Sequence, residues 1–436
     1  NFLRREVLFA PFIQFNVNRI KNMSDTNTVL ANDGTSLKRS LAKSLRRQKI
    51  RALMLIAPLL FFVLLTFIAP IGDMLFRSVE NNIVSDTLPR TVKVLSNWDS
   101  KTGIAPDEEV FEALALDLKL AVKSKRHTKL GSRLNYEKTG ISSLIRQTGR
   151  KVKKLDIETT PSFKAAFEKM NKKWVDPSIW QTIQQFSSKY TDGYFLAAAD
   201  LTRTADGIQS VDEDKKIYFK LFVRTLYMSL GITFMCIILG YPIAFLLATL
   251  PMRTSNVLMI LVLLPFWTSL LVRTSAWKVL LQNQGVINDF LVWIGIIADG
   301  NRLELINNVT GTVIAMTHIL LPFMILPLYS VMKTIPPTYM RAAKSMGAND
   351  FMAFRRVYFP QSIPGIGAGS ILVFILAIGY YITPEIVGGT KGVFISNRIA
   401  YHISSSLNWG LGAALGAILL VVVLALYWLY DKFVGI

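Results

Sequence analysis

The amino-acid sequence predicts an all-α membrane protein with six transmembrane helices. Of its 436 residues 51% are hydrophobic, and the mean hydropathy is positive at +0.38. Several apolar runs are roughly twenty residues long, which is the length of helix that crosses a hydrocarbon core of about 30 Å. We expect the spans at about Ala52–Met74, Phe222–Leu250, Val257–Trp277, Val313–Met332, Ile363–Ile386 and Leu411–Tyr430.

The segment before the first span is polar and basic. We expect residues 1–50 to be a cytoplasmic tail and residues 51–74 to contain the first transmembrane helix. A signal peptide is not expected, because no apolar run in the tail is long enough. Met23, which precedes a stretch rich in Ser, Asp, Thr and Asn, is a candidate for the natural start. Short flanks rich in Lys and Arg stay cytoplasmic, and the tail carries Lys38, Arg39, Lys43, Arg46, Arg47 and Lys49.

This placement of the N-terminus and the even number of spans put the C-terminus inside as well. The same count puts residues 333–361 inside, in agreement with their five cations and single acid. The net charge of +20 suggests nucleic acid as one class of partner. No nucleic-acid recognition motif accompanies that charge, and the flanks of a membrane protein account for it more simply.

Residues 75–218 form one long segment between the first two spans, and the topology makes it a periplasmic insert. Long loops are translocated largely regardless of their charge, so its basic composition is no objection. Helical apolar spacing over Asp107–Val122, and prolines near the starts of Pro161–Met170 and Pro177–Tyr190, predict helices there. We expect a small, loosely packed and mostly helical domain.

Residues 219–432 form the remaining five-span core, interrupted by a basic loop at 333–361. Pro336 and Pro337 can begin a helix of about ten residues, and Gly347 can end it. Asn349 or Asp350 can cap a second helix over Phe351–Tyr358, which Pro360 would close. A plain connector needs only a few residues, so this helix–turn–helix is expected to dock a partner.

The loop resembles the EAA-loop signature of the membrane subunits of ABC importers. The residues that carry this resemblance are Ala342, Ala343, Gly347, Ala348, Phe354 and Pro360. The resemblance implies a type I ABC importer permease fold, in which the loop is the coupling helix that sits in a cleft of an ATP-binding subunit. Arg341 stands where the signature has an acid, so an ion pair made through that acid is not carried over to this chain.

Two further stretches resemble the polyamine branch of these permeases, at residues 264–288 and 379–389. This resemblance implies a spermidine or putrescine importer of the bacterial inner membrane that works by alternating access. The partners it implies are two ATP-binding subunits, a second and distinct permease subunit, a periplasmic solute-binding protein and membrane lipid. No cofactor is expected in this chain, because ATP and Mg would be bound by the ATPase subunits.

Substrate contacts must be polar or aromatic groups inside the helix bundle, because exposing such groups to lipid is costly. Tyr380, Tyr381 and Glu385 on the fifth span fit an amine, which needs an acid and aromatic faces; Glu385 at the outer interface is the plainer alternative. Trp267 and Thr268 on the third span are weaker candidates. Gly365 and Gly369, like Gly412 and Gly416, fit close packing between membrane helices.

Catalysis and metal binding are not expected. The sequence has no Walker A motif, so ATP hydrolysis belongs to a partner. The three histidines lack the spacing of metal ligands, and His318 could instead bond a carbonyl freed by Pro322. The alternatives are an importer of another small solute, such as an amino-acid-like compound, an opine or an inorganic anion, an ATP-independent secondary transporter, or a membrane-anchored receptor.

Overall fold

The computed structural model describes residues 37–157, 159–204 and 207–434. The chain divides into two units, residues up to Asp73 and residues from Met74 onward. Among the described residues five helices are long and apolar enough to cross a membrane, and one bent helix pair raises the number to six if it counts as a single span. The predicted start at Met23 and most of the basic tail lie outside the described residues.

The first span is longer than the sequence predicted. It runs through α2 (Leu37–Val63), a π-helical turn at Leu64–Ile68 and α3 (Ala69–Arg77). In the π turn the Ala69 amide donates to the Leu64 carbonyl, one residue further back than in an α-helix. Pro70 follows directly. A widened turn relieves the clash between a proline ring and the preceding turn, so the helix continues through this proline.

The insert is a well-packed helical domain, so the expectation of loose packing was wrong. Its buried centre contains edge-to-face aromatic pairs, with ring centroids 4.7 Å apart for Phe111 and Trp180 and 5.6 Å apart for Phe167 and Trp174. The sequence showed apolar spacing clearly in only one helix, whereas the core forms from several short ones. These are α4 (Asn82–Thr87), α5 (Pro89–Leu95), α6 (Glu108–Lys123), α7 (Arg126–Asn135), α8 (Ile141–Val152), α9 (Phe163–Met170) and α10 (Pro177–Gln185). The helix that follows them, α11 (Gly193–Ala198), packs instead against the last span.

A short antiparallel hairpin joins the insert to the second span. Strands β1 (Leu201–Thr204) and β2 (Gly207–Ser210) pair with Leu201 opposite Ser210. The Asp200 carboxylate then accepts backbone N–H groups from Ile217, Tyr218 and Phe219 at 2.7–3.2 Å. These amides belong to the first turn of the next helix and would otherwise lack partners. The insert is thus fastened to the start of that helix.

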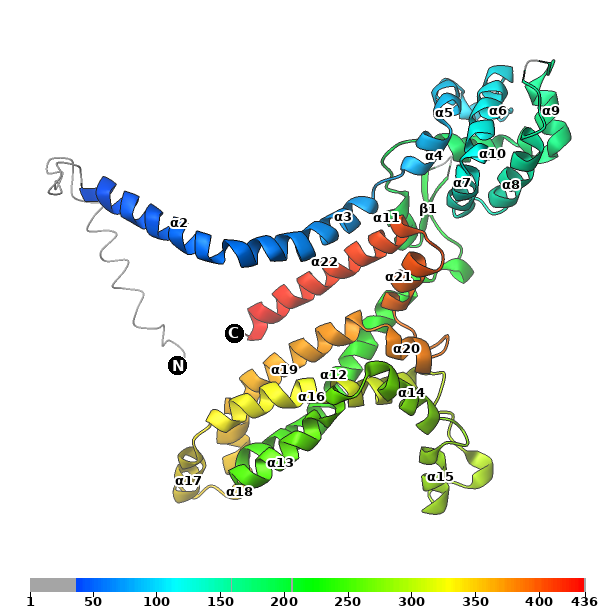
Figure 1. Cartoon of the computed structure of the whole chain (residues 1–436). Coiled ribbons are helices and arrows are strands. Elements are labelled where there is room, and N and C mark those ends of the chain that lie inside the picture. Colours follow the sequence, from blue (N-terminus) through cyan, green and yellow to red (C-terminus); the bar gives the residue numbers. More distant parts are fainter. Residues whose placement is uncertain (1–36, 158, 205–206, 435–436) are drawn as a thin grey trace. The chain divides into compact units, whose positions relative to one another are not determined.

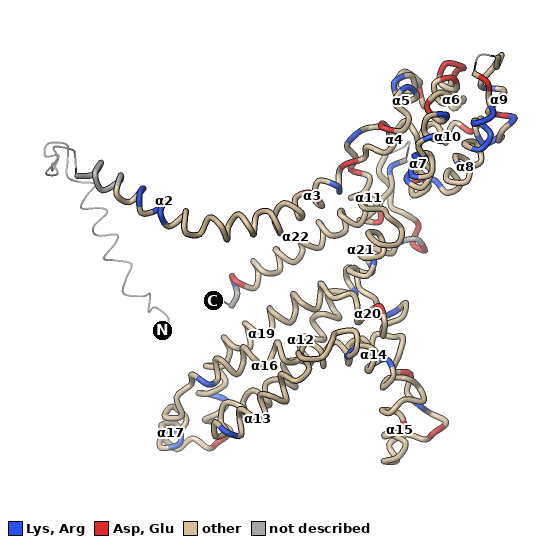
Figure 2. The backbone as a smooth tube through the Cα atoms, viewed as in Figure 1, with Lys and Arg blue, Asp and Glu red and all other residues tan. Residues whose placement is uncertain are grey.

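The centre of the permease core is formed by α12 (Tyr218–Thr249), α16 (Val309–Thr334) and α19 (Phe359–Gly379), which lie side by side (Figure 1). Close packing was expected at Gly365 and Gly369, and the structure confirms it. A Cβ on Gly369 would lie 2.6 Å from the Met324 sulfur of α16, and one on Gly365 3.0 Å from Val331. Charged residues are sparse along these helices and frequent on the insert (Figure 2).

The last span is α22 (Trp409–Val434), and a shorter helix, α21 (Ile395–Ser404), precedes it. A Cβ on Gly412 would lie 3.1 Å from Ile403 of α21, so this glycine serves close packing as predicted. Gly416 has nothing within 4 Å of such a Cβ, so it makes no close contact with the residues that the structure describes.

The third span is not the continuous helix that the sequence predicted. It consists of α13 (Met252–Leu263) with a 3₁₀ turn at Leu264–Trp267, followed by α14 (Leu270–Leu280), and the two parts meet at 95°. Thr268 and Ser269 between them have extended backbone, with ψ of 144° and 141°. Apolar content alone does not reveal such a break, because both halves are hydrophobic.

The fifth span begins and ends earlier than predicted. Pro360 does not close a separate helix, since α18 (Asp350–Ala353) passes through a π turn at Phe354–Tyr358 directly into α19. This π turn ends two residues before Pro360, as the π turn in the first span ends two residues before Pro70. The helix ends at Gly379, and α20 (Ile382–Val387) follows as a separate turn. Pro384 has no N–H that could donate to the Tyr380 carbonyl. This carbonyl accepts a hydrogen bond from the Ser396 hydroxyl instead, at 2.6 Å.

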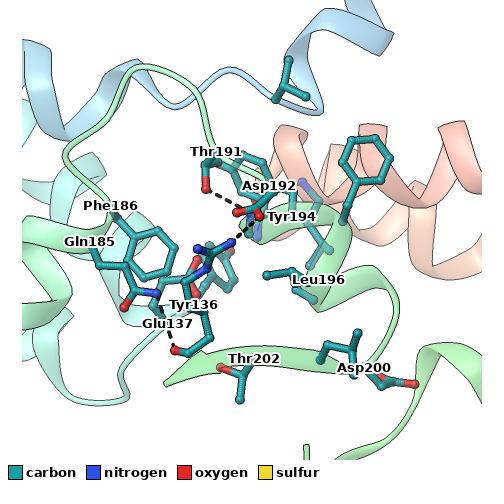
Figure 3. Close-up of a pocket in the computed structure, with 18 of the residues that line it drawn as sticks. Tyr136, Glu137, Gln185, Phe186, Thr191, Asp192, Tyr194, Leu196, Asp200 and Thr202 are labelled. Carbon is teal, nitrogen blue, oxygen red and sulfur yellow. Dashed lines mark hydrogen bonds and ion pairs between the residues drawn. The ribbon is translucent and has the colours of Figure 1, made fainter. Parts of the chain in front are cut away.

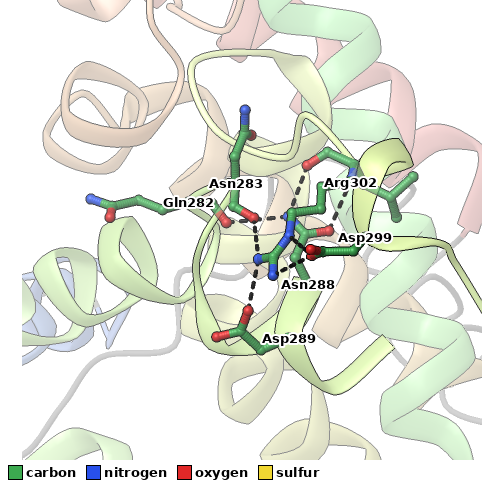
Figure 4. Close-up of polar contacts among 7 residues, drawn as sticks. Gln282, Asn283, Asn288, Asp289, Asp299 and Arg302 are labelled. Atoms are coloured by element: carbon green, nitrogen blue, oxygen red, sulfur yellow. Dashed lines mark hydrogen bonds and ion pairs between the residues drawn. The ribbon is translucent and has the colours of Figure 1, made fainter. Parts of the chain in front are cut away.

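The connection between α14 and α16 is an ordered loop centred on Arg302 (Figure 4). It contains α15 (Val286–Trp293) and a 3₁₀ turn at Asp299–Asn301. The Arg302 guanidinium donates to the Asp289 carboxylate at 2.7 Å and to the Asp299 carboxylate at 2.8 Å. These hydrogen bonds raise the pKa of Arg302. A fixed cation therefore holds this loop.

Candidate functional site

The loop between α16 and α19 contains the helix–turn–helix that the sequence predicted. Its first helix, α17 (Pro337–Ser345), begins with proline. Gly347 follows with φ of +89°. The Gly347 amide donates to the Lys344 carbonyl at 2.9 Å, and the Ala348 amide donates to the Ala343 carbonyl at 3.1 Å. This pair of bonds is the Schellman motif, so the turn expected at Gly347 is confirmed.

The second half of the loop starts at Asn349, as expected. The Asn349 side-chain oxygen accepts the Met352 amide at 2.7 Å, which caps α18. The Lys344 ammonium forms an ion pair with the Asp350 carboxylate across the turn. Both groups are exposed, so this pair contributes little stability. It does neutralise the one acid in the segment.

One face of the loop is anchored on α12 by four rings, the aromatic anchor: Tyr241, Phe245, Phe354 and Tyr358. Phe354 lies edge-on to Phe245 with centroids 5.6 Å apart and edge-on to Tyr241 at 6.1 Å. Tyr358 lies edge-on to Phe245 at 5.1 Å. Such pairs are worth about 0.5–1.5 kcal/mol each beyond their buried area. The anchor therefore joins the loop to α12.

The opposite face carries exposed apolar side chains, of which only Ala342 was named as a contact in the sequence analysis. Tyr339 and Ala342 lie three residues apart on α17, Met346 follows as its C-cap residue, and Phe351 lies on α18. Met346 is 82% exposed, Phe351 70% and Tyr339 49%. We call these four residues the outer stripe. The sequence contained a signal for this face. The buried side of α17 is already supplied by Met340 and Ala343, so the other apolar residues of this short helix are left to face outward.

The residues predicted to contact an ATPase subunit divide between these two faces. Arg341, Ala342, Gly347 and Pro360 are exposed, whereas Ala343 is 5% exposed and Ala348 and Phe354 are half-buried. Phe354 belongs to the aromatic anchor. Within the part of the chain that the structure describes, Arg341 has no ion-pair partner, so its charge is free to meet another protein.

The substrate candidates predicted on the fifth span lie just beyond its end. The Asn397 side-chain amide of α21 donates to the Tyr381 carbonyl at 2.8 Å and to the Glu385 carboxylate at 2.6 Å. The Asn397 oxygen in turn accepts the Phe394 amide at 2.9 Å. Asn397 is 6% exposed, while Tyr381 and Glu385 are exposed. The structure thus brings the Tyr381 carbonyl and Glu385 together at an asparagine that was not predicted, while the Tyr380 carbonyl bonds the neighbouring Ser396.

Trp267 and Thr268 mark the break in the third span. Trp267 is 79% exposed, and the Thr268 hydroxyl donates to the Pro265 carbonyl at 2.9 Å, which closes the 3₁₀ turn. The link that the structure records between α14 and α20 is a buried hydroxyl pair, Thr274 and Thr383, at 3.1 Å. That link places the broken span against the segment that holds Glu385.

His318 does not bond a carbonyl freed by Pro322, so that expectation was wrong. The Trp277 indole N–H of α14 donates to His318 Nδ1 of α16 at 3.0 Å, with ring centroids 5.2 Å apart. The bond crosses from the bent half of the third span to the fourth. One turn before Trp277, the Nε of Arg273 is buried without a partner among the described residues.

A cavity of about 780 Å³ lies where the insert meets the ends of α12, α21 and α22 (Figure 3). Tyr136, Glu137, Asp192 and Tyr194 line it from the insert. Behind it the buried Arg133 pairs with Glu137 at 2.6 Å, and its guanidinium lies 4.6 Å from the centre of the Tyr194 ring. Burial raises the pKa of Tyr194, against the lowering effect of Arg133. The lining is therefore aromatic, and its acids Glu137 and Asp192 are paired with Arg133 and Arg203.

His402 joins this cavity to the core. Its ring nitrogens lie 3.0 Å from the Tyr218 hydroxyl and 2.9 Å from the Ser406 hydroxyl. The Tyr136 hydroxyl of the insert donates to the Ser406 carbonyl at 2.8 Å. Burial, assisted by Arg398, lowers the pKa of His402 to about 4. No group of three or more His, Cys, Asp or Glu suited to a metal ion occurs among the residues that the structure describes.

Comparisons with known proteins identify the family. Residues 237–434 match the model of the binding-protein-dependent transport system inner membrane component. The chain is 35% identical over 215 residues to the spermidine/putrescine transport system permease protein PotB of Escherichia coli (strain K12), covering 49% of this chain and 78% of that one. It is 33% identical over 245 residues to PotB of Haemophilus influenzae, covering 54% and 85%.

A solved chain of a bacterial ABC transporter that imports alginate is 18% identical, covers 50% of this chain and 79% of that one, and has a TM-score of 0.38. Both PotB permeases are more than 30% identical to this chain over more than two thirds of their own length. The chain belongs to the family of binding-protein-dependent transport system inner membrane components, the permease subunits of ABC importers.

Proposed function

We propose that this permease subunit imports spermidine, putrescine or a closely related amine. The observation that carries the proposal is the 35% identity to a spermidine/putrescine permease over 78% of that protein. The position of Glu385 supports it. This carboxylate is exposed, is oriented by Asn397 and lies close in sequence to Tyr380 and Tyr381. An acid beside aromatic faces is the combination that recognises an organic ammonium group.

Energy would enter through the loop at 333–361. The outer stripe offers an apolar surface for a cleft on an ATP-binding subunit, and the aromatic anchor connects its opposite side to α12. Closure of two ATPase subunits on ATP would draw the loops of two permeases together and open the pathway to the other side. The ATP and Mg of this cycle would be held by the ATPase subunits.

The full assembly would contain two ATP-binding subunits, a second and distinct permease subunit, and a periplasmic solute-binding protein. We place both termini and the loop at 333–361 in the cytoplasm and the insert in the periplasm, because cations concentrate in the short flanks. The insert then lies on the side from which a loaded binding protein arrives.

The test is reconstitution of the complete transporter in nanodiscs, with ATP hydrolysis and uptake measured for a panel of solutes. Receptor loaded with spermidine or putrescine is expected to stimulate hydrolysis several-fold over empty receptor. An amino acid and an inorganic anion serve as comparison solutes. Stimulation by one of these and not by the amines would assign another substrate to the same importer. Uptake that continues without ATP would point to a secondary transporter.

A further inference from the structure

A second cavity, of about 660 Å³, lies on the insert where the ends of α6 and α8 meet the start of α7. It is separate from the cavity in Figure 3, and the two share no lining residue. Its ionisable lining is entirely basic, and no acid is among the described residues that line it. The basic side chains are Lys119, Lys123, Lys125, His127 and Lys153.

The four lysines are not neutralised by neighbouring acids. None of them forms an ion pair within the described residues, although the insert also carries many acidic side chains. The Lys119 ammonium is held in place, because it donates to the Leu155 carbonyl at 3.2 Å. Four lysines that line one hollow give it a positive potential. An anion in the hollow would neutralise that potential.

One part of the cavity wall is the imidazole of His127, which is half-buried and packed against its neighbours. A Cβ on Gly149 would lie 3.0 Å from His127 Cδ2 and 3.0 Å from a Val122 methyl group, so the glycine makes room for the ring. His127 Nδ1 lies 3.4 Å from the Ala121 carbonyl oxygen. This contact leaves Nε2 for another partner. The site thus combines four exposed ammonium groups with one half-buried imidazole.

Lysines near helix C-termini can also be explained by their interaction with the last carbonyls and the negative end of the helix dipole. The partial charges of the helix ends around this cavity are therefore compared with the charge of the four lysines. The C-terminal ends of α6 and α8 and the N-terminal end of α7 border the cavity. Each end contributes a partial charge of about half an elementary charge, which leaves a net contribution near minus one half. Four ammonium groups exceed it several-fold, so the hollow remains electropositive.

We propose that this cavity binds a phosphate-class anion, either as free phosphate or as the headgroup of a lipid. A phosphate group offers several acceptor oxygens on one compact, multiply charged centre, and lysine binds it as a point charge. The volume exceeds that of a single phosphate, which leaves room for a substituted one. The proposal does not depend on the transported solute.

The first experiment titrates inorganic phosphate into the purified full-length chain in nanodiscs of neutral phosphatidylcholine. We expect saturable binding by calorimetry that weakens as sodium chloride rises. The double variant Lys123→Gln/Lys153→Gln should bind about tenfold more weakly. The matched control is Lys172→Gln/Lys173→Gln, which removes the same charge from exposed lysines elsewhere on the insert and should bind like the unmodified chain.

The second experiment separates the two sources of phosphate. Vesicles containing phosphatidylglycerol are compared with pure phosphatidylcholine vesicles for capture of the nanodisc-embedded chain. Capture by phosphatidylglycerol alone, lost in Lys123→Gln/Lys153→Gln, would assign a lipid headgroup, whereas phosphate binding without capture would assign a free anion. The proposal is overturned if neither probe binds saturably, or if both double variants lose binding equally, because the lysines then act only through net charge.

Discussion

The Asn397 amide of α21 donates to the Glu385 carboxylate of α20 at 2.6 Å and to the Tyr381 carbonyl at 2.8 Å. One buried side chain therefore fixes the orientation of an exposed acid and of the chain segment beside it. The Asn397 amide gives the carboxylate one hydrogen bond, which satisfies only part of its acceptor capacity.

Glu385→Gln is expected to raise the amine concentration needed for half-maximal ATPase stimulation by about tenfold. Glutamine keeps an oxygen that can accept the Asn397 bond, so the change removes charge and preserves shape. The assay is receptor-stimulated hydrolysis in nanodiscs. Glu304→Gln, at an exposed acid of the loop between α14 and α16, is the control. Equal behaviour of the two variants would exclude Glu385 from the pathway.

Gly347→Ala should weaken coupling to the ATPase subunits. Its φ of +89° costs a residue with a side chain about 1 kcal/mol, although nothing lies within 4 Å of an added Cβ. Strain rather than a clash is therefore the cause. The measurement is the amount of ATPase subunit recovered with the tagged permease. Gly416→Ala, which is equally uncrowded but helical, should recover the normal amount.

Arg341→Glu is expected to reduce recovery of the ATPase subunit, and Arg341→Lys to leave it nearly unchanged. The side chain is exposed and has no ion-pair partner in the described part of the chain, so its charge acts mainly on a docking protein. Loss of association rate at low salt, measured by surface plasmon resonance, would reveal it. Lys172→Glu on the insert is the control. If it reduces the recovery of the ATPase subunit as much as Arg341→Glu does, the total charge of the chain is responsible and not the position of Arg341.

Gly369→Ala should destabilise the helix bundle by about 1–3 kcal/mol. The new methyl group would lie 2.6 Å from the Met324 sulfur and 3.2 Å from the Met324 carbonyl oxygen, so the sulfur can move but the backbone cannot. Thermal unfolding in detergent measures the change as a lower Tm. Gly231→Ala on α12 has nothing within 4 Å and should retain the Tm. An unchanged Tm for Gly369→Ala would contradict the close packing of α16 and α19.

Acidification should loosen the contact between the insert and the core through His402. Its pKa of about 4 in the folded chain lies below the usual value of 6.5. The unfolded chain therefore takes up the proton first, and stability falls as pH drops from about 6.5 toward 4. Tm measured across this range should decline. The decline should be smaller in His402→Gln, and an identical pH profile in that variant would assign it to other groups.

The sequence identified the turn in the loop at 333–361, but it misjudged which residues of the loop face outward. The Schellman turn depends on a glycine and on local hydrogen bonds, so it could be predicted from residues 343–348 alone. The inward position of Phe354 depends on Phe245, more than one hundred residues earlier in the chain. No local pattern specifies such a partner.

The residues predicted for the substrate pathway show the same division between local and long-range information. Glu385, Tyr380 and Tyr381 were predicted from residue type, because acids and aromatic side chains near a span are uncommon enough to stand out. Asn397, Thr274 and Thr383 were missed, since small polar residues are ordinary in any sequence. Only their contacts across the fold give them a role.

The sequence by itself determined that the chain is helical and apolar enough for a membrane, and it located the glycines and prolines that form turns and permit close contacts. These properties follow from hydropathy, helix length and local backbone sterics. Only the tertiary structure decided that the third span breaks by 95°, that the short helices of the insert share one core, and that four lysines surround one cavity. The physical reason is that packing and charge clustering depend on residues far apart in the chain.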